Sequence, residues 1–472
     1  MKLKRPSVKF IVISVFVLIL LFCVSFFARE YFGNLFVGFT MDEIDLPGPG
    51  DRVLVFAPHS DDEALGAANL IKRSRENGAE VKVVLVTNGD GFARAVAIET
   101  ANISPKPSDY IKYGYERQKE SLAAMKHLGL EDKDVIFLGY PDRGIASMWS
   151  SNWMNSTPYK SRYTKTDKSP YNNSYSSDAL YSGENLYNDI SKIIEDYKPT
   201  HIVYPHPNDR HTDHWGVYDF VKFAITSINY TPQHEWLYLV HRGGWPTPLK
   251  RNRNLFLSPP LSLLNKGTEW FSLHMSDEEI EAKSQVLKLY VSQAKRISLL
   301  MSAFERKNEL FGVYPNAKLI QSVRPDNDIE PDNDNQIIQD PKKDAITLEV
   351  KTSSDITDVH MELSEENNLH AFILLDSHAD KLTTYYLNMV FLQNGQGIPL
   401  RLTIKNKKLE PLKQDAFGLA ANDIQLKISK NILHVIIPND KIGAYDHIFV
   451  NAESSVSPYY MDRTAWRMID VR

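Results

Sequence analysis

Short apolar runs alternate with longer amphipathic stretches over the first two thirds of the chain. The runs at 53–56, 81–87, 135–138 and 201–204 are rich in Val, Ile and Leu, as the buried strands of a parallel sheet are. Apolar residues at helical spacing predict helices at 63–77, 115–128, 185–197, 214–226, 277–291 and 294–304. This alternation predicts an α/β fold, Rossmann-like, with a mostly parallel sheet flanked by helices.

The pattern changes towards the end of the chain. Short runs with β-branched and aromatic residues lie at 346–350, 371–375, 382–392, 400–404, 424–428 and 432–437. Their spacing predicts a C-terminal antiparallel β-sandwich-like domain, which serves either as a spacer or as a glycan-binding module. The stretch 324–343 before it is rich in Asp, Asn and Pro and predicts a linker. Its two DND triplets lack the Gly and Glu of a helix-loop-helix calcium loop.

The amino-terminal segment 10–28 is almost unbroken in apolar residues and is about as long as a bilayer requires. Basic residues precede it and acidic residues follow it, which predicts a transmembrane helix with a cytoplasmic amino terminus. We expect a single-pass protein of the cell membrane whose body is extracytoplasmic. A cleaved secretory signal is the alternative, although Phe26 and Phe27 do not suit a small-residue cleavage site.

Composition narrows the possible chemistry. A chain of 472 residues with a net charge of −5 and no basic block does not suggest nucleic acid as the main partner. Cys23 is the one cysteine, which excludes intramolecular disulfides and Cys-rich zinc sites. Any metal must therefore be held by His and carboxylate side chains.

Two polar clusters follow two of the predicted strands. The first is HSDDE at 59–63, and the second is PHPNDRHTDH at 205–214. Ligands of open α/β sheets bind at the carboxyl ends of strands, so both clusters are expected at one site. His59, Asp62 and His214 together supply two imidazoles and one carboxylate, the ligand set of a catalytic Zn²⁺ that keeps a position open for water.

The neighbouring side chains suit hydrolysis. Zinc can lower the pKa of a bound water to roughly 7, and Asp61 is placed to take its proton. His211 would stabilise an oxyanion or protonate a departing amine, while Asp209 and Asp213 would orient an imidazole. The alternative for Asp209 is an ordinary loop carboxylate. Each cluster also has a plainer interpretation, as an acidic helix start or a surface turn.

These motifs resemble the LmbE/PIG-L family of zinc-dependent N-acetylglucosaminyl deacetylases, whose signature is a strand ending in HPDDE and a later HPDH-type element. The segments RQKES at 117–121 and LGYPD at 138–142 also resemble parts of that family. The resemblance implies the same ligands and base, and implies that Arg117 and Asp142 contact the substrate. One departure is Ser60, which stands where the family usually has Pro. The alternatives are a surface ion pair between Arg117 and Glu120 and a turn cap at Asp142.

We therefore expect a membrane-anchored hydrolase that removes the N-acetyl group from an N-acetylglucosamine-containing glycan or glycoconjugate. The alternatives are a catalytically silent carbohydrate-binding surface protein and a zinc amidase for another N-acyl substrate. No oligomeric state is predicted. The expected organisation is a cytoplasmic tail and anchor at 1–30, a tether at 31–50, a deacetylase-like domain at 51–305, a linker at 306–343 and a β-rich accessory domain at 344–472.

A long segment, 145–181, separates the third strand from the next helix. Its aromatic residues are Trp149, Trp153, Tyr159, Tyr163 and Tyr171. Loops of this length in a compact domain tend to be functional or disordered. The rings either stack on sugars or pack a surface flap onto the body.

Overall fold

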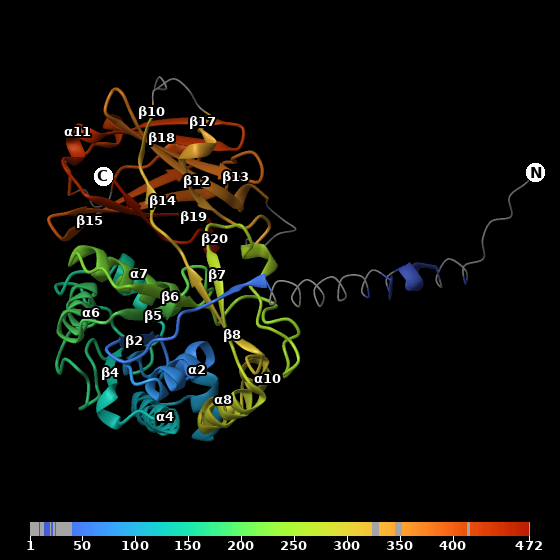
Figure 1. Cartoon of the computed structure of the whole chain (residues 1–472). Helices are drawn as coiled ribbons and strands as arrows, with labels where there is room; N and C mark the ends of the chain where they lie inside the picture. The colour runs from blue at the N-terminus through green and yellow to red at the C-terminus, as the bar shows by residue number, and fades with distance from the viewer. Residues whose placement is uncertain are drawn as a thin grey trace, which may run out of the picture.

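The structure is a computed structural model that describes residues 9, 14–18, 20–21, 24, 40–322, 330–344, 352–412 and 416–471. Figure 1 shows an α/β lobe, whose last elements are α10 (Ser298–Ala303) and β8 (Asn308–Val313), and a β-rich lobe formed by the strands from β9 onwards. Among the described residues, no helix is long and apolar enough to cross a membrane. Most of the predicted anchor at 10–28 and the strand predicted at 346–350 lie outside the described residues.

One sheet forms the centre of the α/β lobe. Its strand order is β1-β7-β8-β6-β5-β2-β3-β4. The bounds are Asp42–Glu43 (β1), Arg52–Ala57 (β2), Glu80–Thr87 (β3), Val135–Tyr140 (β4), His201–Pro205 (β5), His234–Tyr238 (β6), Glu269–His274 (β7) and Asn308–Val313 (β8). β2 to β6 pair in parallel, whereas β8 is antiparallel to both of its neighbours. The mixed α/β sheet is as predicted, but β6, β7 and β8 were missed because their runs mix aromatic and polar residues.

Helices cover both faces of this sheet. Their bounds are Asp62–Glu76 (α2), Ala93–Glu99 (α3), Pro107–His127 (α4), Ile145–Ser150 (α5), Gly183–Tyr197 (α6), Thr212–Ser227 (α7), Asp277–Leu289 (α8) and Val291–Ala294 (α9). Alternate residues of β2 separate two cores, with Val53 and Val55 facing α2 and α8, and Leu54 and Phe56 facing α6 and α7. α4 begins earlier than predicted, because Pro107 and Asp109 form a helix start that apolar spacing does not reveal.

The helix that carries the first polar cluster is kinked. Ala67 of α2 has φ −145°, which breaks the helical hydrogen-bond ladder. The freed amides of Asn69 and Leu70 donate to Glu309 of β8 at 2.9 and 3.0 Å. Lys283 of α8 donates to the Leu65 carbonyl and forms a 2.7 Å ion pair with Glu309, with both side chains fully buried. β8 and α8 therefore fix the position of α2.

Two sheets share the core of the β-rich lobe. The first has the order β10-β12-β13-β18-β17 with β11 on β12, and the second β16-β15-β14-β19-β21-β9 with β20 on β19. Most pairs are antiparallel, but β10 with β12 and β9 with β21 are parallel. The bounds are Ala317–Lys318 (β9), Ile320–Ser322 (β10), Gln336–Gln339 (β11), Ile356–Ser364 (β12), Asn368–Leu375 (β13), Thr384–Gln393 (β14), Gln396–Lys405 (β15), Lys408–Leu409 (β16), Gln425–Ser429 (β17), Ile432–Pro438 (β18), His447–Val456 (β19), Tyr459–Arg463 (β20) and Arg467–Asp470 (β21).

The stretch predicted as a linker contains strands of both lobes. β8 belongs to the α/β sheet, whereas β9, β10 and β11 add to the edges of the two later sheets. Edge strands need only one partner, so these short segments form without the long apolar runs that identify a central strand. The chain therefore crosses between the lobes as a series of paired segments, and the proposed domain boundaries stay a prediction.

Aromatic side chains join the two lobes. Trp149 of α5 lies 5.2 Å from Phe220 of α7 and 5.5 Å from Phe449 of β19, measured between ring centroids. Trp153 stacks on Phe220, and the Tyr171 hydroxyl donates to Asp90 at 2.6 Å. These three rings of the long segment are packing residues. Tyr159 and Tyr163 stay partly exposed.

Asp219 of α7 is a buried carboxyl group beneath the β-rich lobe. It has no exposed surface, and neither oxygen has a hydrogen-bond partner among the described residues. Burial raises its pKa well above the ordinary value, although Arg463 acts in the opposite direction. The neutral form therefore stabilises the fold. Its contribution is complete below about pH 4 and is lost as the pH rises through the folded-state pKa.

Replacing this group with a neutral isostere should stabilise the protein at alkaline pH. We expect Asp219→Asn to raise the free energy of unfolding by about 1–3 kcal/mol at pH 8, with a smaller gain at pH 5. Denaturant unfolding at both pH values measures the difference. Asp196→Asn, at an exposed position of α6, is the control and should show little change. A gain that is the same at both pH values would contradict the assignment.

Candidate active site

The carboxyl ends of β2 and β5 bring the two polar clusters together. These strands are parallel neighbours, with Val55 opposite Val203, so the turns that follow them leave the sheet side by side. The ring centroid of His59 lies 4.7 Å from that of His211 and 5.4 Å from that of His214. The predicted convergence of the clusters is therefore present in the structure.

His59, Asp62 and His214 form a compact group of donor atoms. Asp62 Oδ2 lies 3.0 Å from His59 Nδ1 and 3.0 Å from His214 Nε2. Two ligands bound to one tetrahedral zinc at about 2.0–2.1 Å would lie roughly 3.3 Å apart. His214 is fully buried, yet neither ring nitrogen has hydrogen-bond geometry to any described residue. A buried imidazole that faces a carboxylate in this way fits the binding of a divalent metal.

His241 also belongs to this group and was missed by the sequence reasoning. Donor atoms of Asp62, His214 and His241 lie within 4.8 Å of one another, as do those of His59, His211 and His214. His241 follows β6, a strand that the apolar pattern did not predict. The signal was present, because the apolar run 236–240 ends at a histidine just as the other two clusters begin.

Buried carboxylates hold the imidazoles from behind. Asp209 Oδ2 lies 3.1 Å from His214 Nδ1 and accepts hydrogen bonds from the amides of Val240 and His241. Asp213 Oδ2 lies 3.1 Å from His59 Nε2 and accepts from the Arg143 amide at 2.6 Å. Both aspartates thus lie where they can orient a ligand imidazole, the position predicted for them.

Asp61 occupies the left-handed start of α2. Its φ of 111° is unusual for a residue other than glycine, and strain of this kind is typical of functional sites. Burial raises the pKa of this carboxyl to about 8, whereas Arg117, 3.5 Å away, favours the ionised form. Asp61 lies next to the candidate metal ligands but is not one of them. Its carboxylate is therefore available to act as a general base.

His211 is partly exposed and lies next to His59 and His214. Its Nδ1 accepts a hydrogen bond from the Asp213 amide at 3.3 Å, which leaves the proton on Nε2. Burial and the neighbouring histidines lower its pKa to about 2. A neutral imidazole with Nε2–H is a hydrogen-bond donor, so the geometry favours the oxyanion role over protonation of an amine.

Arg117 and Asp142 are buried next to the group. Arg117 donates to the Gly89 carbonyl at 2.8 Å and to the Ser60 carbonyl, which fixes the turn that carries Asp61. Asp142 Oδ1 lies 3.5 Å from His59 Nε2. The alternative of a surface ion pair is wrong, because Arg117 is buried and Glu120 accepts from Ser292 instead. Their contact with substrate stays a prediction.

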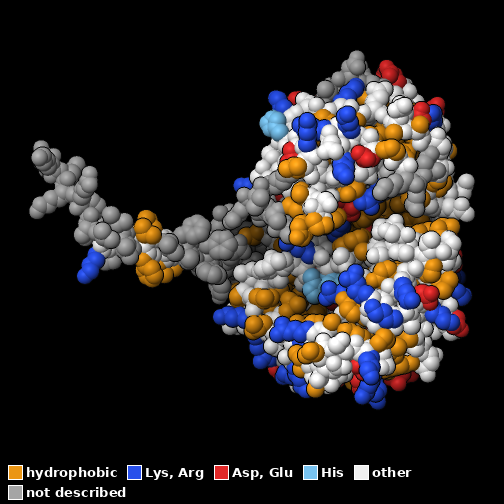
Figure 2. Space-filling view, turned by 180° about the vertical axis from the view of Figure 1, so that it is seen from behind, with side chains coloured by type: hydrophobic (Ala, Val, Ile, Leu, Met, Phe, Trp, Pro, Cys, Tyr) orange, Lys and Arg blue, Asp and Glu red, His pale blue; other side chains and the backbone are white. Residues whose placement is uncertain are grey.

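Figure 2 shows histidine side chains at the surface near the junction of the lobes. Of the five histidines at or near the candidate site, which are 59, 206, 211, 214 and 241, only His211 and His241 are partly exposed.

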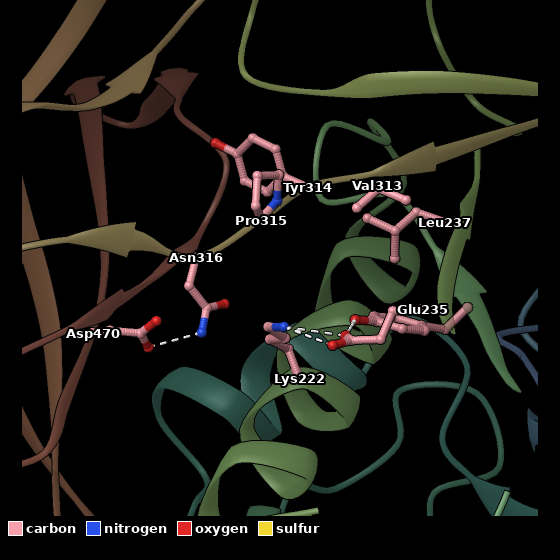
Figure 3. A pocket seen from close by; sticks show the side chains of 9 residues that line it. Lys222, Glu235, Leu237, Val313, Tyr314, Pro315, Asn316 and Asp470 are labelled. Carbon is pink, nitrogen blue, oxygen red and sulfur yellow. Dashed lines mark hydrogen bonds and ion pairs between the residues drawn. The ribbon is translucent and has the colours of Figure 1, made fainter. Parts of the chain in front are cut away.

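A separate cavity of about 350 Å³ lies between α7, β6 and β21. In Figure 3 its polar groups pair with each other, Lys222 with Glu235 at 3.1 Å and Asn316 with Asp470 at 2.9 Å. It contains none of the predicted site residues.

Residues 54–225 match the protein family described as "PIG-L: GlcNAc-PI de-N-acetylase". The chain carries a PIG-L domain. The matched residues include the three candidate ligands and both candidate catalytic side chains, but His241 and the β-rich lobe lie outside them. The resemblance noted in the motifs is therefore confirmed over this part of the chain.

Several solved structures show a limited likeness to this chain. N,N'-diacetylchitobiose deacetylase from Pyrococcus horikoshii is 17% identical, with 57% of this chain and 88% of that chain covered and a TM-score of 0.35. A deacetylase-teicoplanin complex is 18% identical, with coverages of 55% and 97% and a TM-score of 0.36. GalB, a 4-carboxy-2-hydroxymuconate hydratase from Pseudomonas putida, is 11% identical, with coverages of 57% and 98% and a TM-score of 0.32. At such scores these likenesses carry no weight on activity.

The position of Asp209 behind His214 gives a test of the metal group in the PIG-L domain. Asp209→Asn should weaken zinc affinity by about 10–100-fold, because the imidazole loses the carboxylate that orients it. Competition with a zinc-binding dye measures the affinity. Asp178→Asn, at an exposed carboxylate of the same lobe, should leave it unchanged. Equal zinc affinities in the wild type, Asp209→Asn and Asp178→Asn would show that Asp209 does not support the site.

Proposed function

We propose that this protein is a zinc-dependent hydrolase that removes the N-acetyl group from an N-acetylglucosamine-containing glycan or glycoconjugate. The observation that carries the proposal is the donor group of His59, Asp62 and His214, with Asp61 and His211 beside it. The PIG-L domain match supports the acetamide as the bond that is cleaved. Zinc held by the three ligands would supply an activated water and polarise the acetyl carbonyl.

Asp61 and His211 have different roles in the proposed reaction. Asp61 accepts the proton of the attacking water, and Arg117 holds the Ser60–Asp61 turn so that the carboxylate stays in place. His211 donates from Nε2 to the oxyanion that forms on the acetyl carbonyl. The protonated Asp61 then returns its proton to the departing amine. Acetate and the free amine leave without a covalent enzyme intermediate.

The remaining aspartates keep the imidazoles in one orientation. Asp213 and Asp142 both face His59 Nε2, so His59 presents Nδ1 towards Asp62 and the donor group. Asp209 faces His214 Nδ1, so this ring presents Nε2. Holding the rings in place before substrate binds avoids reorganisation during the reaction. A binding protein without turnover would not require such a group.

Acetate release tests the proposal directly. The zinc-loaded protein should release acetate from at least one N-acetylglucosamine conjugate in a broad panel, and Asp61→Asn should lower kcat by about 10²–10⁴-fold with zinc still bound. The isosteric amide keeps the packing but cannot accept the proton. Asp196→Asn should retain full activity. Removal of metal with a chelator should abolish the activity and added zinc should restore it.

Other outcomes of this assay would overturn the proposal. Absence of acetate release over the whole panel, with zinc bound stoichiometrically, would favour a carbohydrate-binding protein. Release of longer acyl groups in preference to acetyl would identify an amidase for another N-acyl substrate. A normal kcat in the Asp61→Asn variant would show that another residue is the general base.

We also propose that residues 10–28 anchor the protein in the cell membrane with its body outside the cytoplasm. Support comes from the apolar length and from the basic residues before it. Added protease should therefore digest the body in intact cells, whereas a cytoplasmic marker protein should survive. A body that is degraded only after the cells are lysed would contradict this topology.

A further inference from the structure

Three aspartates gather where the β-rich lobe meets the loops of the PIG-L domain. Asp340 follows β11, Asp344 lies four residues later, and Asp462 belongs to β20. One carboxylate oxygen of each residue lies within 4.8 Å of the others. Oxygens that share one calcium ion at bonds of about 2.4 Å lie at most about 4.8 Å apart. The spacing of the three carboxylates therefore suits a cation of this size.

Two of the three carboxylates each have a buried oxygen without a hydrogen-bond partner among the described residues. Asp340 is only 3% exposed, and its Oδ2 is buried without a hydrogen-bond partner among the described residues. Asp344 uses Oδ2 for Arg242, at 3.0 Å, while its Oδ1 is also buried and unpartnered in the described part of the chain. Asp462 accepts one backbone amide on each oxygen, which leaves a lone pair on each. A buried acceptor without a donor is costly unless a cation or proton satisfies it.

The neighbouring guanidinium groups do not fill this role. Arg242 and Arg210 both face Asp344 Oδ2, at 3.0 and 3.6 Å, and Arg242 also donates to the carbonyl of Asn208. Arg463 donates to the carbonyls of Thr464 and Pro207 and lies over the Trp215 ring at 4.3 Å. Among the described residues, none of these guanidinium groups forms a hydrogen bond or ion pair with Asp340, and none therefore satisfies its free oxygen.

The pKa values of these carboxyl groups reflect both their burial and the repulsion among them. Burial raises the pKa of Asp340 well above the ordinary range, and the charges of Asp462 and Asp344 raise it further. Burial and Asp344 also raise the pKa of Asp462, to about 7. Carboxylates that repel one another in a dry position are stabilised either by protonation or by a bound cation.

We propose that Asp340, Asp344 and Asp462 bind a divalent cation of the calcium class at the junction of the two lobes. All the donors are oxygens, which hard cations such as calcium prefer. This site is distinct from the zinc group, because it shares no residue with it. It also differs from the DND triplets at 326–328 and 332–334 in the sequence, because Asp340 follows both of them.

The cation would connect the β-rich lobe to the loops of the candidate active site. The Arg210 guanidinium donates to the Asp344 carbonyl at 3.0 Å, and Arg242 pairs with the Asp344 side chain at 3.0 Å. Arg210 precedes His211 in the chain and Arg242 follows His241. Fixing Asp344 therefore restrains the two loops that carry the partly exposed histidines. The role of the cation is structural and does not depend on the proposed deacetylation.

Calcium-dependent unfolding tests the site. With one equivalent of zinc bound, the full-length protein in detergent should gain about 1–4 °C in unfolding temperature on addition of calcium chloride, with a midpoint in the range of about 10⁻⁴–10⁻³ M. Sodium chloride at matched ionic strength should not reproduce the shift. Asp340→Asn should lose it, although this variant folds, because the substitution removes a repulsive charge and keeps the shape of the side chain.

Two further variants make the result decisive. Asp423→Asn, at a carboxylate of the β-rich lobe that pairs with Lys441, should keep the full calcium shift. Asp62→Asn should also keep it, because that substitution affects only the zinc group. An equal shift in wild type and Asp340→Asn would place the calcium elsewhere and overturn the proposal. Absence of any shift in the wild type would overturn it as well, and would mean that a proton satisfies the cluster.

Discussion

The convergence of like charges in a dry position is the constraint on which this structure depends. Asp62, Asp142, Asp209 and Asp213 are all buried within a few ångströms of His59 and His214. Carboxylates so close together stay ionised only when imidazoles, backbone amides or a cation surround them. The turns after β2, β5 and β6 supply the imidazoles and amides. These contacts leave His59, Asp62 and His214 at the centre as a candidate donor group for a metal.

The outer elements of the protein hold those turns in place. The Lys283 and Glu309 ion pair satisfies the kink of α2, so the helix that begins with Asp62 rests on β8 and α8. Arg117 of α4 performs a similar role for the Ser60–Asp61 turn. The β-rich lobe contributes from the other side, where Asp344 binds the two arginines beside His211 and His241. This lobe is therefore a support of the site as well as an appended domain.

The long aromatic segment shows how one pattern can contain two roles. Trp149 packs against both α7 and the β-rich lobe and so stabilises the junction, whereas Trp153 packs against α7 and Tyr171 donates to Asp90 within the α/β lobe. Tyr159 and Tyr163 are partly exposed, and Tyr163 lies close to Asp142 and Arg143. Aromatic composition alone could not separate the buried rings from the partly exposed ones, because both have the same hydrophobicity.

The sequence by itself determined the α/β alternation, the β-rich end and the two His/Asp clusters, because strand and helix periodicity and the ends of apolar runs are local properties. His241 was missed although it follows the apolar run 236–240, because β6 begins with the polar residues His234 and Glu235. Arg117 could not be placed, because its partners are backbone carbonyls far away in the chain. Only the tertiary structure decided which carboxylates are buried together, since that depends on strand order and on the packing of β8 to β11 between the lobes. Burial and charge pairing are long-range properties, and they convert a set of acidic residues into two distinct candidate cation sites.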